Sequence, residues 1–161
     1  MSAISKEDVL SLREKTGAGL IDCKRALIES NGDVDEAVSI LRKKGVASAA
    51  KKAGRDAGEG VIAQAVSSDR SKGVLAEVNC ETDFVAKNEN FVTFASEVAG
   101  VLLDDPDADL ESTRTEQVAK IGENIRISRS QGIAVASEGL VESYVHTGGK
   151  VAVLLSLGAD S

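Results

Sequence analysis

The stretch VASAAKKAGRDAGEGVIAQAV, residues 46–66, divides the chain into two parts of different secondary structure. Its first half is rich in alanine and lysine, a composition that suits a helical or partly helical linker. From Val61 to Val66 the apolar side chains instead follow the pattern of a strand. This change of periodicity predicts an α+β fold, with a boundary between Val46 and Gly58.

Three short helices are predicted on the N-terminal side of this boundary. Ser5 and Asp8 have the spacing of a capping box, which marks the start of the first helix. Apolar residues at helical spacing indicate a second helix over about 20–30 and a third from Asp33 to just before Gly45. The residues that carry this spacing are Leu20, Cys23, Leu27, Val34, Ala37, Val38 and Leu41. Three such helices are expected to form a compact bundle.

A hairpin and further helices are predicted on the C-terminal side. Residues 61–66 and 74–78 have the pattern of two strands joined by a polar turn. One helix is predicted to end before the acidic loop around Pro106, and another to run up to Ile121. From Ile125 on, apolar and polar residues alternate, which indicates a further strand. The helix before the acidic loop is marked by Phe91, Phe94, Ala95, Val98 and Leu102.

Part of the hairpin sequence recurs along the chain. Glu59-Gly60-Val61-Ile62 returns 79 residues later as Glu138-Gly139-Leu140-Val141, and Val74-Leu75 returns at the same offset as Val153-Leu154. The equal offset predicts a second copy of the hairpin. A helical segment follows the first copy, whereas the sequence ends at Ser161 after the second. Either the sequence is a fragment or other strands complete the hairpin, and an exposed strand edge leaves a homo-oligomer as an open alternative.

Charge argues for a protein partner rather than nucleic acid. The 161 residues carry a formal net charge of -7, whereas phosphate binding needs clustered lysine and arginine. Basic residues crowd only the segment 43–55, a pattern more typical of a solvated helix face than of a binding site. No stretch has the length of a membrane span and the N-terminus lacks the pattern of an export signal, so a cytoplasmic location is expected.

Motifs for catalysis and cofactor binding are missing from the sequence. It contains no GxxxxGK[ST] loop, no GxGxxG and no HExxH, so no bound nucleotide, cofactor or catalytic metal is expected. The single histidine lies in the turn-like stretch His146-Thr147-Gly148-Gly149, where a Ser/His/Asp triad would have to be built around a loop residue. We therefore expect a binding protein and not an enzyme.

Three segments are more specific than a generic fold requires: TGAGLIDCK at 16–24, NCETDFVAKN at 79–88 and IGENI at 121–125. In these segments the chain closely resembles the elongation factor Ts family, and the resemblance covers nearly the whole chain in the family's order. The middle segment carries the family's Thr-Asp-Phe signature. Longer members continue through a complete second core subdomain, so the chain resembles a C-terminally shortened member.

The resemblance implies an architecture and a partner. It implies an N-terminal three-helix module similar to ubiquitin-associated domains with its linker (1–54), a first core subdomain with helices on one side of an antiparallel sheet (55–137), and an incomplete second hairpin repeat (138–161). Family members bind elongation factor Tu and promote release of GDP. The helical module grips the G domain, and an Asp-Phe pair intrudes near the magnesium and phosphate site. The matching partner-binding residues are Arg13, Leu20, Ile21, Lys24, Asp83, Phe84, Ile121, Gly122 and His146.

Residue spacing alone leaves alternatives open. Phe84 and Phe91 are seven residues apart, so one helix could bury both, and spacing favours a core role for Phe84 that only the family motif reverses. Gly122 can equally be a helix stop. For the whole chain, the alternative is a helical adaptor that uses residues 1–45 to bind protein partners without exchange activity. Such an adaptor would not need Thr82-Asp83-Phe84.

Overall fold

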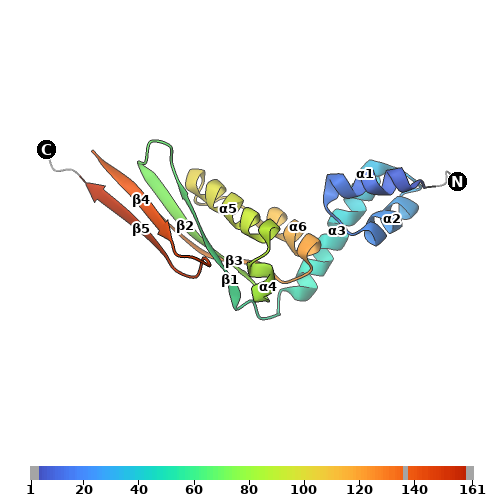
Figure 1. Ribbon diagram of the computed structural model, residues 1–161. Coiled ribbons are helices and arrows are strands. Elements are labelled where there is room, and N and C mark those ends of the chain that lie inside the picture. The colour runs from blue at the N-terminus through green and yellow to red at the C-terminus, as the bar shows by residue number, and fades with distance from the viewer. Residues whose placement is uncertain (1–3, 136–137, 159–161) are drawn as a thin grey trace. The chain divides into compact units, whose positions relative to one another are not determined.

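The computed structural model describes residues 4–135 and 138–158, which divide into two units. The first unit consists of the residues up to Gly54 and Thr115–Glu123, and the second of Arg55–Arg114 and the residues from Asn124 on. Helices make up the first unit, and the second contains all the strands (Figure 1). The predicted α+β class is confirmed, with the change from helix to strand at the predicted boundary. No helix within the described residues is long and apolar enough to span a membrane.

The first unit contains three consecutive helices, α1 (Lys6–Thr16), α2 (Leu20–Glu29) and α3 (Val34–Lys52). The predicted capping box begins α1. The Ser5 hydroxyl accepts the Asp8 N–H at 3.0 Å, and the Asp8 carboxylate accepts the Ser5 N–H at 3.0 Å. These bonds satisfy backbone amides that the first turn of a helix leaves without an intrahelical partner.

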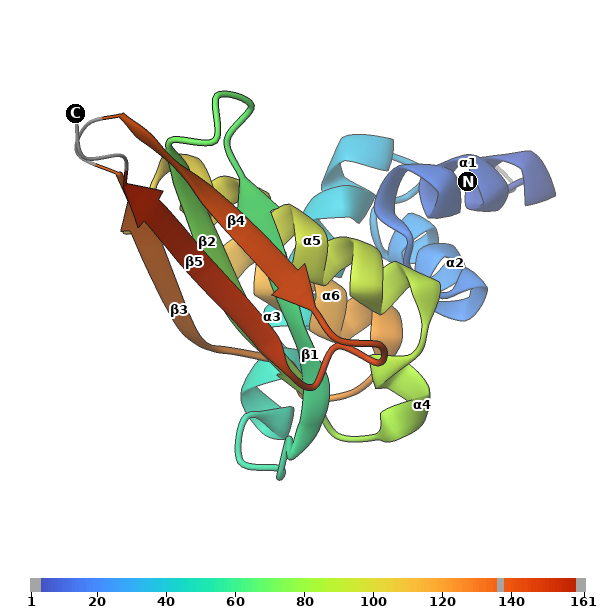
Figure 2. The same cartoon turned by 60° about the vertical axis from the view of Figure 1, so that its left-hand side comes forward.

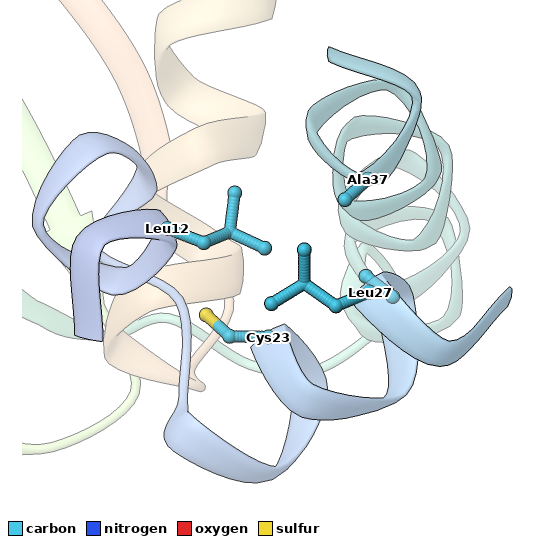
Figure 3. Close-up of a cluster of buried hydrophobic side chains, with 5 residues drawn as sticks. Leu12, Cys23, Leu27 and Ala37 are labelled. Carbon is cyan, nitrogen blue, oxygen red and sulfur yellow. The ribbon is translucent and has the colours of Figure 1, made fainter. Parts of the chain in front are cut away.

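A fully buried cluster holds the three helices together. It consists of Leu12 from α1, Cys23, Ala26 and Leu27 from α2, and Ala37 from α3. Figure 3 shows the side chains of Leu12 and Leu27 pointing toward each other between the helices. Leu20, which shares the helical spacing of Cys23 and Leu27, is not part of this cluster and is 44% exposed. Helical side chains tilt toward the N-terminus, so Leu20, as the first residue of α2, extends beyond the cluster.

Helix α3 is longer than predicted because it continues through Gly45. This glycine is buried, and a Cβ added to it would lie 3.3 Å from the Cβ of Ala119. Ala119 belongs to α6 (Glu111–Ile121), whose residues from Thr115 on are part of the same unit. Two small residues at this contact let the helices approach closely. Gly45 therefore serves packing and does not end the helix.

The second unit contains an antiparallel sheet of three strands in the order β1-β2-β3. The strands are β1 (Glu59–Val66), β2 (Lys72–Cys80) and β3 (Arg126–Ala134). The first two form the predicted hairpin, and β3 is the strand predicted after Ile125. Helix α5 (Glu89–Asp104) covers one face of this sheet (Figure 2). Its buried residues are Phe91, Phe94, Ala95, Val98, Ala99 and Leu102, which include the whole predicted stripe.

A second hairpin, β4 (Gly139–Val145) and β5 (Ala152–Gly158), packs on the opposite face of the sheet from α5 (Figures 1 and 2). Backbone hydrogen bonds join the two hairpins. The Ile62 N–H donates to the Gly149 carbonyl at 2.7 Å, and the N–H of Val141 in β4 donates to the Arg70 carbonyl at 2.7 Å. The second unit is therefore layered as helix, sheet and hairpin.

The two hairpins share one pairing register. Val61 pairs with Val78 in the first hairpin, and Leu140 pairs with Leu157 in the second, each 79 positions later. A Cβ at Gly60, or at its counterpart in β4, would overlap a carbonyl oxygen of the partner strand at the corresponding position. The repeat predicted from the sequence is thus present as a repeated backbone arrangement.

Candidate functional site

A four-residue helix, α4 (Asp83–Ala86), presents Phe84 to solvent. The hydroxyl of Thr82 caps this helix by accepting a backbone N–H at 3.3 Å. Ala86 is the buried residue of the helix, whereas Phe84 is 83% exposed. Because α5 is a separate helix, Phe84 does not share the buried face that holds Phe91. The reading of Phe84 as a core residue is therefore wrong.

The carboxylate of Asp83 forms an ion pair with Lys87, one helical turn later, at 2.7 Å between Oδ2 and Nζ. The hydrogen bond from Lys87 lowers the pKa of Asp83 and, reciprocally, raises the pKa of Lys87. Both groups are therefore charged at neutral pH. The pair lies in solvent and is weak, so a partner's groups can replace it at small cost. Lys87 was not among the site residues predicted from the sequence, although its i,i+4 spacing from Asp83 is a signal that could have found it.

Four of the predicted residues lie on the surface of the helical unit, in the helices on either side of the α1–α2 turn. Gly17 ends α1 with a φ of 67° and donates its N–H to the Arg13 carbonyl at 2.7 Å, a left-handed cap that favours glycine. Arg13 and Lys24 are exposed, as are Leu20 and Ile21, the latter at 69%. We call these four residues the α1–α2 corner. Its exposed apolar groups flanked by cations fit a contact with another protein.

The C-terminal end of α6 lies beside this corner. A Cβ added to Gly17 would be 2.8 Å from Cε of Lys120, so the last turn of α6 packs against the α1–α2 turn. Gly122 has a φ of 88°, and its N–H donates to the Val118 carbonyl at 2.9 Å, which makes it a helix stop. Ile121 is half-buried. Ile121 and Gly122 directly follow Lys120, whose side chain lies against the α1–α2 turn, and all belong to one unit.

His146 lies in the exposed turn between β4 and β5, as predicted. Its backbone N–H donates to the Val151 carbonyl at 2.8 Å, and the Tyr144 hydroxyl is 3.0 Å from its Nδ1. This tyrosine contact fits a surface turn better than a proton relay. Over residues 4–135 and 138–158, no three histidine, cysteine or acidic side chains are grouped to hold a metal ion.

A groove of about 600 Å³ lies between β1, the end of α4, the start of α5 and the turn that carries His146. Its lining residues include Val61, Ile62, Ala86, Lys87, Val92 and His146. The structure therefore brings His146 to the same groove as Lys87, the ion-pair partner of Asp83. The walls are largely apolar with a few polar groups, an arrangement suited to recognition.

The sequence of this chain is similar to those of one family of known proteins. Residues 81–161 match the sequence model of the family described as "Elongation factor TS". Proteins named "Elongation factor Ts" from Clostridium perfringens (strain SM101 / Type A) and Nautilia profundicola are each 46% identical to the chain, over 98% and 100% of its length. The protein of that name from Symbiobacterium thermophilum is 49% identical over 98% of the chain. The chain spans 56%, 57% and 54% of these three relatives, which is about half of their length.

Proposed function

Because the chain belongs to the elongation factor Ts family, we propose that it binds elongation factor Tu and promotes the release of GDP from it. The observation that carries this proposal is the exposure of Phe84 beside an ionised Asp83, on a short helix outside the core. The protein would act in the cytoplasm as a translation elongation factor. It would work by binding, without a chemical step of its own.

Exchange of this kind follows from a difference in affinity. A protein that binds the nucleotide-free state of its partner more tightly than the GDP-bound state must weaken GDP binding by the same factor. A coupling free energy of about 3 kcal/mol corresponds to roughly a 150-fold change in affinity. Contacts that are equal in the two states contribute to docking but not to exchange.

The α1–α2 corner is suited to docking. Leu20 and Ile21 supply exposed apolar area, and Arg13 and Lys24 supply positive charge at its margin. We expect this corner to contact an apolar surface with acidic groups on the G domain of the partner, and to make similar contacts in both nucleotide states. Ile121 follows Lys120, which packs against the α1–α2 turn, and would extend the contact.

Asp83 and Phe84 are suited to the differential contact. An aromatic side chain that is already exposed loses little internal packing when it enters a partner. The neighbouring carboxylate adds a negative charge, which would oppose the phosphates of GDP or compete for the magnesium ion. In this proposal α4 intrudes near that site, and His146 contacts the partner from the adjoining groove.

The proposal is tested by the release of fluorescently labelled GDP from elongation factor Tu, with and without the chain. We expect the release rate to rise with chain concentration and to saturate. Calorimetry with the chain and GDP alone serves as the control, since the chain has no phosphate-binding loop and should not bind the nucleotide. Binding to elongation factor Tu without faster release would favour the adaptor alternative. Absence of both binding and faster release would refute the proposal.

A further inference from the structure

Glu81, the second residue before α4, holds together segments that are far apart in the sequence. One carboxylate oxygen, Oε1, accepts the backbone N–H of Asn124 at 2.6 Å. The same oxygen lies 3.4 Å from Nη1 of Arg55. The Glu81 side chain is 22% exposed, so these charge-assisted bonds are partly shielded from water.

A second set of bonds closes this arrangement. The Asn124 side chain is 1% exposed and donates through Nδ2 to the Arg55 carbonyl at 2.8 Å. Arg126 donates to the same carbonyl at 3.2 Å. Arg55, Glu81 and Asn124 are therefore linked pairwise, and we call them the Glu81 clamp. All three belong to the second unit.

The clamp lies where α4 needs support. A helix of four residues is too short to be stable alone, and α4 buries Ala86 while Phe84 remains in solvent. Its direction must therefore be set by the residues that precede and follow it. The chain also enters the second unit at Arg55 and again at Asn124, so the clamp fixes both of these entry points next to the start of α4.

We propose that Glu81 is a positioning residue for the exchange reaction, holding α4 so that Asp83 and Phe84 meet the partner in one fixed orientation. This inference rests on the proposed function. It assigns Glu81 no contact with the partner. Loss of the clamp should therefore leave docking intact and impair the step that depends on the orientation of α4.

The test compares Glu81→Ala with Glu77→Ala in the full chain. Glu77 is a matched control because it lies in β2, four residues before Glu81, and forms an ion pair with Arg129 at 2.6 Å on the sheet. We expect Glu81→Ala to lower the maximal rate of GDP release about tenfold, since a displacement of about 1 Å can cost up to about 100-fold. The chain concentration giving half-maximal rate should change by less than about twofold. Glu77→Ala should change neither quantity.

Hydrogen–deuterium exchange provides a readout independent of activity. The Ala86 and Lys87 amides donate to Thr82 and Asp83 carbonyls at 3.1 and 3.2 Å within the helix. These amides should exchange faster in Glu81→Ala and not in Glu77→Ala. Glu81→Gln keeps an acceptor for the Asn124 N–H but loses the charge, so its effects should be intermediate.

Equal maximal rates and equal amide exchange in the Glu81→Ala and Glu77→Ala variants would overturn the proposal. A parallel loss of docking and exchange would also overturn it, because it would assign Glu81 to the contact surface or to general stability. If Glu81→Ala does not fold, Glu81→Gln carries the same comparison. An unmodified chain that fails to release GDP would refute the proposed function, while amide exchange of α4 would still decide whether the clamp holds that helix.

Discussion

Replacing Phe84 by alanine separates a core role from a contact role. A phenylalanine side chain can bury about 150–250 Å². Since Phe84 is 83% exposed, about 30 Å² is covered, and at about 25 cal/mol per Å² its removal should cost less than about 1 kcal/mol of stability. Phe91 is fully buried, so Phe91→Ala should cost about 3–5 kcal/mol. These values correspond to melting-temperature shifts of up to about 4 °C for Phe84 and at least about 6 °C for Phe91.

The effect on GDP release should have the opposite order, with Phe84→Ala slowing release more than Phe91→Ala. If Phe84 favours the empty state of the partner, its truncation should remove about 2 kcal/mol of differential binding, which slows GDP release about thirtyfold. Affinity for the GDP-bound partner should change far less, because the α1–α2 corner keeps its contacts. Stopped-flow release of labelled GDP and a binding titration measure these two quantities. Val101→Ala is a suitable control, since Val101 is a partly exposed apolar residue of α5 away from the proposed site.

One result would refute this reasoning directly. A Phe84→Ala variant that melts many degrees lower, while its folded fraction releases GDP at the normal rate, would show that Phe84 stabilises the fold and does not act on the partner. Equal losses of docking and release would instead show that Phe84 is an anchor common to both nucleotide states.

Further variants test the other parts of the structure. Lys24→Ala should weaken association with elongation factor Tu, most strongly at low ionic strength, whereas Lys43→Ala should not; titrations at two salt concentrations measure this. Hydrogen bonds from two serine hydroxyls and a backbone amide lower the pKa of Asp69 from 3.8 to about 2. The ionised carboxylate therefore stabilises the β1–β2 turn above about pH 4, and this contribution is lost as the pH falls through about 2. Thermal melts should show the stability difference between the wild type and Asp69→Asn shrinking as the pH is lowered over that range. Gly60→Ala should destabilise the second unit, because Gly60 has a φ of 146° and its Cβ would overlap the Val78 carbonyl oxygen; chemical denaturation should show a lower midpoint with the slope unchanged.

Features set by neighbouring residues were predictable from the sequence. The capping box at Ser5 depends on a partner three residues away, and the buried stripe of α5 depends on spacing within one helix. The hairpin repeat was visible because both copies keep glycine where a Cβ would meet the partner strand. The candidate site at Asp83 and Phe84 was recognised from its motif, although spacing alone favoured the opposite role for Phe84.

Features that depend on which distant segment packs against a residue were not predictable from the sequence. Gly45 was taken as a helix end, but its contact with Ala119 requires a helix that lies far along the chain. The clamp was also hidden, since Glu81 is separated from Arg55 by 26 residues and from Asn124 by 43. Nothing in the pattern of single segments indicates that these three residues meet.

The sequence by itself determined most of the helices and strands, the repeat and the family motif, because helix caps, turns and amphipathic spacing depend on interactions within a few residues. It did not predict the short helix α4 or the full length of α3. Only the tertiary structure decided which apolar side chains are core and which are surface. Phe84 and Phe91 have the same chemistry and lie seven residues apart, yet one is 83% exposed and the other is fully buried. The difference arises because α5 packs on the sheet and α4 turns Phe84 away from it, and burial depends on the surface that a fold brings to a residue.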